Sequence, residues 1–130
     1  MKLSDIKGEK VFDVIADIIE PVATIAQDKE AMALFDASGK PEDMGGWDWF
    51  VERAKKSVPV LMRTYKHELC VILATINGVS VDEYVNGKPN PDYDPDDPES
   101  QERIGGLSVP KLFSNVIELV TDSEFISFFS

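Results

Sequence analysis

The side chains with the greatest potential for chemistry do not complete a catalytic or zinc-binding pattern. His67 and Glu68 begin the zinc-protease pattern His-Glu-x-x-His, but the second histidine would stand at position 71, where the chain has Val71. No other histidine is present, so a zinc site would need Cys70 and carboxylates in an unusual mixture. A serine or cysteine nucleophile needs a nearby base, and one histidine leaves no pattern for a triad. We therefore predict no catalytic, cofactor-binding or metal-binding residue.

The aspartates of the second half of the chain resemble the start of a calcium-binding loop. Asp92, Asp94 and Asp96 have the Asp-x-Asp-x-Asp spacing of an EF-hand. That loop needs glycine at its sixth place and glutamate at its twelfth, where this chain has Asp97 and Arg103. The pattern therefore predicts an acidic, solvated loop.

Two further groups can act as binding surfaces. A basic cluster either contacts an acidic partner or balances the acidic loop within the molecule; it consists of Arg53, Lys55, Lys56, Arg63 and Lys66. Trp47 and Trp49 point to different sides of a helix. Either one of them packs under the loop at 36–46, or one is exposed as an interface anchor.

Composition sets the class of protein. At 130 residues the chain predicts a single domain, and 43% hydrophobic residues are enough for a core. The net charge of −11 repels nucleic acids and anionic membranes, so we expect neither as a partner. No apolar run approaches the roughly 18 residues of a membrane span. The lone cysteine and the absence of a signal-peptide core predict a cytoplasmic protein.

The elements that must position these residues are helical. Residues 8–35 carry apolar side chains at steps of three and four, which are Val11, Val14, Ile15, Ile18, Val22 and Ile25. Phe12 and Ile19 widen this stripe, and charged residues occupy the other side. The stripe keeps its phase through Pro21, which predicts a kink or a brief break in one helix.

Capping residues predict where the other helices begin. The predicted N-caps are Asp28, Ser57, Ser80, Ser108 and Thr121. The pair Asn77-Gly78 predicts a helix end. Residues 86–106 hold four prolines and six acidic side chains and predict an exposed loop or mobile insertion. The sequence therefore predicts an all-α, compact bundle of about six to seven short helices.

Several segments together resemble the tail assembly chaperones of long-tailed, siphovirus-type phages and prophages of Gram-positive bacteria. They are MKLSDIKGEK at 1–10, VIADIIEP at 14–21, VILATINGV at 71–79, LSVPKL at 107–112 and LVTDSEF at 119–125. The resemblance implies a small helical protein that coats the tape measure protein in the host cytoplasm until tail tube subunits polymerise. It also implies self-association, a longer frameshifted form in many members, and absence from the mature virion.

The sequence thus favours a non-enzymatic chaperone that binds an apolar helical partner. The candidate partner-binding residues are aromatic or lie at the edge of the first stripe, namely Phe12, Ile19, Trp47, Trp49, Phe125, Phe128 and Phe129. The aromatic residues at the C-terminal end either complete the core or bind a partner or sister subunit. The alternative function is an acidic phage inhibitor that mimics DNA and blocks a host nucleic-acid enzyme.

Overall fold

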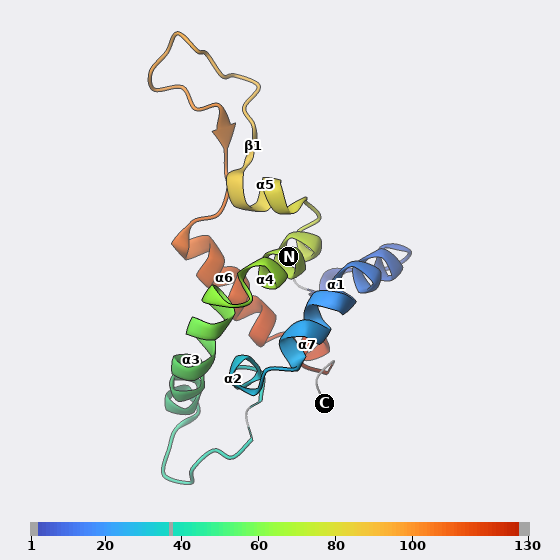
Figure 1. Ribbon diagram of the computed structural model, residues 1–130, viewed down its shortest axis with the longest axis vertical. Coiled ribbons are helices and arrows are strands. Elements are labelled where there is room, and N and C mark those ends of the chain that lie inside the picture. Colours follow the sequence, from blue (N-terminus) through green and yellow to red (C-terminus); the bar gives the residue numbers. More distant parts are fainter. Residues whose placement is uncertain (1–2, 37, 128–130) are drawn as a thin grey trace.

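The computed structural model describes residues 3–36 and 38–127, which form a helical bundle with one projecting hairpin (Figure 1). The all-α prediction is confirmed, because the described residues hold seven α-helices and a single sheet of two very short strands. In chain order the elements are η1 (Leu3–Asp5, a 3-10 helix), α1 (Lys10–Ala26), α2 (Lys29–Met32), α3 (Gly46–Arg63), α4 (Lys66–Ile76), α5 (Val81–Asn86), β1 (Lys88–Pro89), β2 (Arg103–Ile104), α6 (Val109–Val120) and α7 (Ser123–Ser127).

The centre of the bundle is the pair α1 and α4, which pack on each other more extensively than any other described pair of elements. The core side of α1 carries Val14, Ile18, Val22 and Ile25. The core side of α4 carries Leu69, Ile72, Leu73 and Ile76. Pro21 is buried inside α1, and the helix continues past it to Ala26, so that of the predicted kink or brief break, the break does not occur.

Side-chain caps fix several helix starts as predicted. The Asp28 carboxylate accepts hydrogen bonds from the backbone N–H groups of Glu30 and Ala31 and begins α2. The hydroxyls of Ser80 and Ser108 likewise accept from backbone N–H groups in the first turns of α5 and α6. Gly78, with φ of +72°, follows the end of α4, where an L-residue would be strained.

The prediction that Ser57 begins a helix is wrong. Ser57 lies inside α3, because the helical spacing that starts at Trp47 continues through it without interruption. Its buried hydroxyl donates a hydrogen bond to the Ala31 carbonyl and so ties α3 to α2. Pro59 lies on the exposed side of α3.

The predicted N-cap Thr121 is also misplaced by one residue. Thr121 ends α6, where its hydroxyl donates to the Ile117 carbonyl. Asp122 precedes α7 instead, and its carboxylate accepts a bond from the Phe125 N–H. The same buried carboxylate accepts bonds from the N–H and the hydroxyl of Ser4, which fastens η1 to the start of α7.

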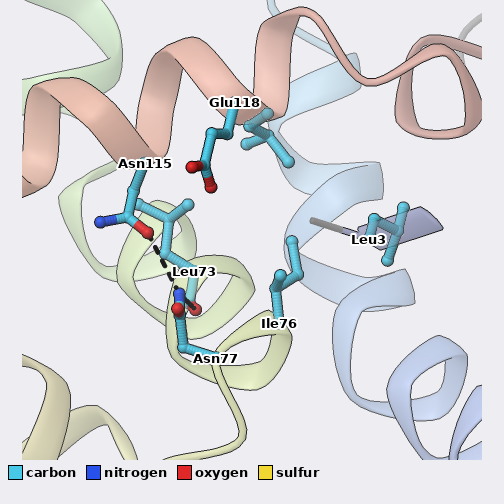
Figure 2. A pocket seen from close by; sticks show the side chains of 7 residues that line it. Leu3, Leu73, Ile76, Asn77, Asn115 and Glu118 are labelled. Carbon is cyan, nitrogen blue, oxygen red and sulfur yellow. Dashed lines mark hydrogen bonds between the residues drawn. The ribbon is translucent and has the colours of Figure 1, made fainter. Parts of the chain in front are cut away.

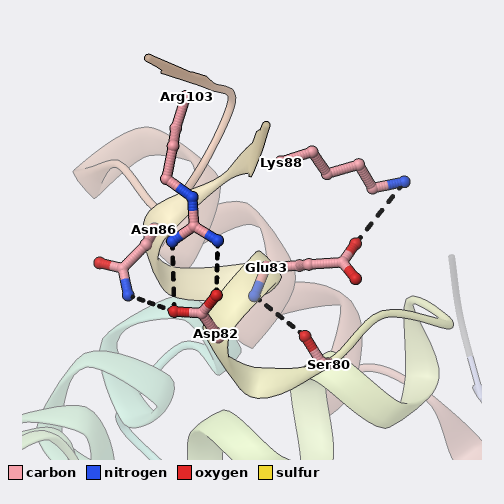
Figure 3. Close-up of polar contacts among 6 residues, drawn as sticks. All are labelled: Ser80, Asp82, Glu83, Asn86, Lys88 and Arg103. Atoms are coloured by element: carbon pink, nitrogen blue, oxygen red, sulfur yellow. Dashed lines mark hydrogen bonds and ion pairs between the residues drawn. The ribbon is translucent and has the colours of Figure 1, made fainter. Parts of the chain in front are cut away.

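Residues 87–106 form a hairpin that follows α5 and projects from the bundle (Figure 1). The prediction of an exposed acidic loop is correct for its tip, but the sequence did not predict the two short strands at its base. Gly87 makes this base possible, since its φ is +87° and a β-carbon there would collide with the Ile104 carbonyl. At the base, the Arg103 guanidinium donates to both oxygens of Asp82 on α5, at 3.2 and 2.6 Å (Figure 3).

This ion pair predicts an unusual titration. The hydrogen bonds from Arg103 and then Asn86 lower the pKa of Asp82 to about 2. The stabilisation is therefore complete above the ordinary aspartate pKa of 3.8 and is lost as the pH falls through about 2. A carbon-13 NMR titration of the Asp82 carboxyl should show this low midpoint, and Arg103→Gln should return it toward 3.8. An unchanged midpoint in the variant would contradict the pairing.

Tyr84 on α5 supports a second prediction. Its ring is buried beneath the Lys111 ammonium, which lies 5.2 Å from the ring centroid, yet its hydroxyl has no hydrogen-bond partner among the described residues. Burial raises the pKa of Tyr84 to about 12. Tyr84→Phe should leave the free energy of unfolding unchanged or raise it by up to about 1 kcal/mol in a urea titration, because an unpaired buried hydroxyl costs free energy. A loss of more than about 1 kcal/mol would mean that the hydroxyl is satisfied.

Candidate protein-interaction surface

Helix α1 divides its surface into three faces, because successive residues are about 100° apart. One face is buried against the bundle, as described above. The second face is apolar and exposed, and we call it the α1 stripe; it consists of Phe12, Ile15, Ala16, Ile19 and Ala23. The third face is acidic and exposed, and we call it the acidic edge; it consists of Asp13, Asp17 and Glu20.

The α1 stripe is the main exposed apolar feature of this helix. Phe12 is 78% exposed, Ile19 is 53% exposed and Ile15 is 43% exposed. The sequence correctly singled out Phe12 and Ile19 as residues beyond the core. The sequence did not show that Ile15 is also exposed, because the spacing of apolar residues does not reveal where the buried arc of the helix ends. Three large apolar side chains at steps of three and four form a surface suited to another helix.

The two tryptophans occupy different environments, as predicted. Trp47 is 69% exposed and stacks on Phe50, with ring centroids 5.6 Å apart. Trp49 is half-buried and lines an open groove of about 550 Å³ between α2, α3 and the intervening loop, together with Met32 and Met44. Trp47 therefore remains a candidate contact, whereas Trp49 forms part of the wall of this groove.

The predicted binding role of Phe125 is wrong. Its side chain is 1% exposed and packs edge-on against Phe35, with ring centroids 5.4 Å apart. Asp122 turns the chain into α7 so that Phe125 points into the core, which is the other option that the sequence left open. Phe128 and Phe129 lie outside the described residues.

The basic cluster does not balance the acidic hairpin. Helix α3, which carries most of it, extends toward the opposite end of the molecule from the hairpin (Figure 1). Arg53 donates to the Leu34 carbonyl at 2.8 Å, and Lys55 pairs with Glu52 at 3.0 Å. The contacts of these two cations are therefore local, within α3 and between α3 and Leu34.

A second exposed apolar pair was missed by the sequence interpretation. Val109 is 83% exposed and Phe113 is 65% exposed, one turn apart on α6. Helical spacing places them on the same side as the buried residues Val116 and Val120, so their exposure has no sign in the spacing of apolar residues. The buried residues of α6 that the structure describes all lie in its C-terminal half, whereas in its first turn only Leu112 packs, partly buried, against the core.

A small cavity between three elements of the bundle has no room for a ligand. It lies between α4, α6 and η1, beside the hydrogen bond from Asn77 to Asn115, and holds about 10 Å³ (Figure 2). That volume is roughly the minimum for one water molecule. The larger hollows are open grooves on the surface.

The chemically active residue types are dispersed. His67 is exposed on α4 and Cys70 is half-buried, where burial raises the pKa of its thiol. In the hairpin, the carboxylates of Asp94 and Asp97 accept bonds from the N–H groups of Asp96 and Glu99 and thereby close turns. Within the described ranges, no group of three or more His, Cys, Asp or Glu side chains is arranged to hold a metal ion.

Among residues 3–36 and 38–127, no helix has the length and apolar character needed to cross a membrane. Compared with protein-family models, curated proteins and solved structures, the chain shows no match.

Proposed function

We propose that this protein is a non-enzymatic assembly chaperone that binds an amphipathic helix of a client protein along the α1 stripe. The observation that carries the proposal is the exposure of Phe12, Ile15 and Ile19 on one face of a helix whose buried face packs into the core. Burying such a surface against an apolar helix face removes it from water, which drives association. The packing of α1 on α4 fixes the helix that carries these three side chains.

The client is proposed from the sequence resemblance to tail assembly chaperones. It is the tape measure protein of a long-tailed phage, a long helical protein that must stay soluble until the tail tube forms around it. The chaperone would act in the host cytoplasm and leave the client as tail tube subunits polymerise, so it would be absent from the finished virion.

Co-expression tests this function. The tape measure protein of the same phage or prophage is produced with and without this chain, and its soluble fraction is measured after centrifugation. We expect the soluble fraction to rise several-fold with the chain and the two proteins to copurify. Equal solubility with and without the chain would contradict the proposal.

A DNA-mimicking inhibitor agrees less well with the structure. Such a protein presents carboxylates along an extended face, whereas six acidic side chains here lie together in the hairpin tip at 92–102. Binding to a basic host enzyme that 0.5 M salt abolishes would favour the inhibitor, while salt-resistant binding to an apolar helix would favour the chaperone.

A further inference from the structure

The acidic edge defines the charge pattern of the helix that docks on the α1 stripe. We propose that this partner helix carries lysine or arginine along one side of its apolar face, the side that meets Asp13, Asp17 and Glu20. This inference rests on the proposed function, because it specifies the client helix for the same surface.

The first support is the asymmetry of α1. The acidic edge borders the stripe on the side of Ala16, and its three side chains are all exposed. On the other side, the stripe is bordered by Val11, which is half-buried, and by Val22, which is buried. A helix lying along the stripe therefore meets carboxylates on one flank and aliphatic side chains on the other.

The second support is the shape of the surface beside the acidic edge. An open groove of about 390 Å³ separates α1 from the N-terminal half of α4, and Asp17, Glu20 and Glu68 line it with His67. A second groove, of about 430 Å³, continues toward α5. Its charged residues are Lys10, Asp13, Asp17 and Glu83. Long basic side chains from a docked helix can enter these grooves while their carbon chains pack on the apolar wall.

The third support is that the carboxylates are available. In the described part of the chain, none of Asp13, Asp17 and Glu20 takes part in an ion pair. Three like charges on one helix face repel one another slightly, and a basic partner relieves that repulsion. Exposed ion pairs add little affinity singly, but a one-sided row of them sets the orientation of the partner and speeds its association.

Two synthetic helical peptides test the inference. They share one apolar stripe and differ only along one flank, which carries lysine in one peptide and glutamate in the other. Dissociation constants are measured by fluorescence anisotropy at low salt and at 0.5 M NaCl. We expect the lysine peptide to bind about ten-fold more tightly at low salt, and the difference to shrink at high salt.

Matched variants assign the effect to the acidic edge. The triple variant Asp13→Asn, Asp17→Asn, Glu20→Gln should remove the preference for lysine. The control Asp92→Asn, Asp96→Asn, Glu99→Gln removes the same number of charges from the hairpin tip and should keep the preference. These hairpin carboxylates accept no hydrogen bond within the described residues, so the control leaves the hairpin turns intact.

The outcomes separate this inference from the proposed function. Equal binding of both peptides, lost on Phe12→Asp with Ile19→Asp, would overturn the charge pattern and leave the docking surface standing. A preference for lysine that the hairpin control removes would also overturn it. Failure of both peptides and of the tape measure protein to bind would overturn the proposed function itself.

Discussion

Phe125→Ala should lower the free energy of unfolding by about 3–5 kcal/mol, which is a large part of the stability of a domain of this size. The Phe125 ring is 1% exposed and meets the Phe35 ring, so truncation removes buried apolar area and leaves a cavity. It also loosens α7, which packs on η1 and α6. Urea denaturation followed by circular dichroism measures the change.

Phe12→Ala is the matched control for this prediction. It removes the same atoms from a side chain that is 78% exposed, so the free energy of unfolding should change by no more than about 0.5 kcal/mol. Similar small effects of both substitutions would contradict the placement of Phe125 in the core and restore it as a candidate contact.

The double substitution Phe12→Asp with Ile19→Asp should weaken client binding by about 100-fold or more. Both side chains are the most exposed large apolar groups of the α1 stripe, and central apolar contacts dominate the energy of most interfaces. A carboxylate at either position would be desolvated by the client without a partner. The dissociation constant for the tape measure protein, or for its soluble fragments, is the measurement.

The α6 pair provides the control for this binding experiment. Val109→Asp with Phe113→Asp makes the same chemical change on a helix surface that is equally exposed but lies on another element. Binding should be retained within about three-fold, and both variants should keep the circular dichroism spectrum of the wild type. If the α6 variant loses binding and the α1 variant keeps it, the docking surface is on α6 instead.

The parts of the fold that local sequence specifies were predicted well. The caps Asp28, Ser80 and Ser108 and the stop at Gly78 each depend on a short-range backbone requirement that the residue type reveals. Ser57 shows the limit of this reasoning. A serine followed two residues later by proline is typical of a helix start. Here α3 packs on α2 and continues through Ser57, whose hydroxyl makes a tertiary hydrogen bond to α2.

The hairpin base shows a second limit. Residues 88–89 and 103–104 have little strand character, so their pairing depends on contacts distant in sequence. The Arg103–Asp82 ion pair spans 21 residues, and Gly87 permits the close approach of the second strand. Neither interaction has a local signature.

The candidate surface was predictable in part. Helical periodicity identified α1 and marked Phe12 and Ile19 as its outer edge. It gave no sign that Ile15 belongs to the same exposed strip, or that the core stops short of Phe113 on α6. Both depend on how far the neighbouring elements extend over a helix, and that is set by tertiary packing. The sequence also places Asp13, Asp17 and Glu20 on one side of the helix. It does not show that they border an exposed apolar surface, because the exposure of the stripe depends on tertiary packing.

The most direct test of the docking surface is a nitrogen-15 NMR titration of this chain with the tape measure protein or its soluble helical fragments. We expect the largest shift and intensity changes on α1, at residues 12–23, and on the facing end of α4 near His67 and Glu68. Changes confined to α6, to the groove beside Trp49, or to the hairpin tip would contradict it.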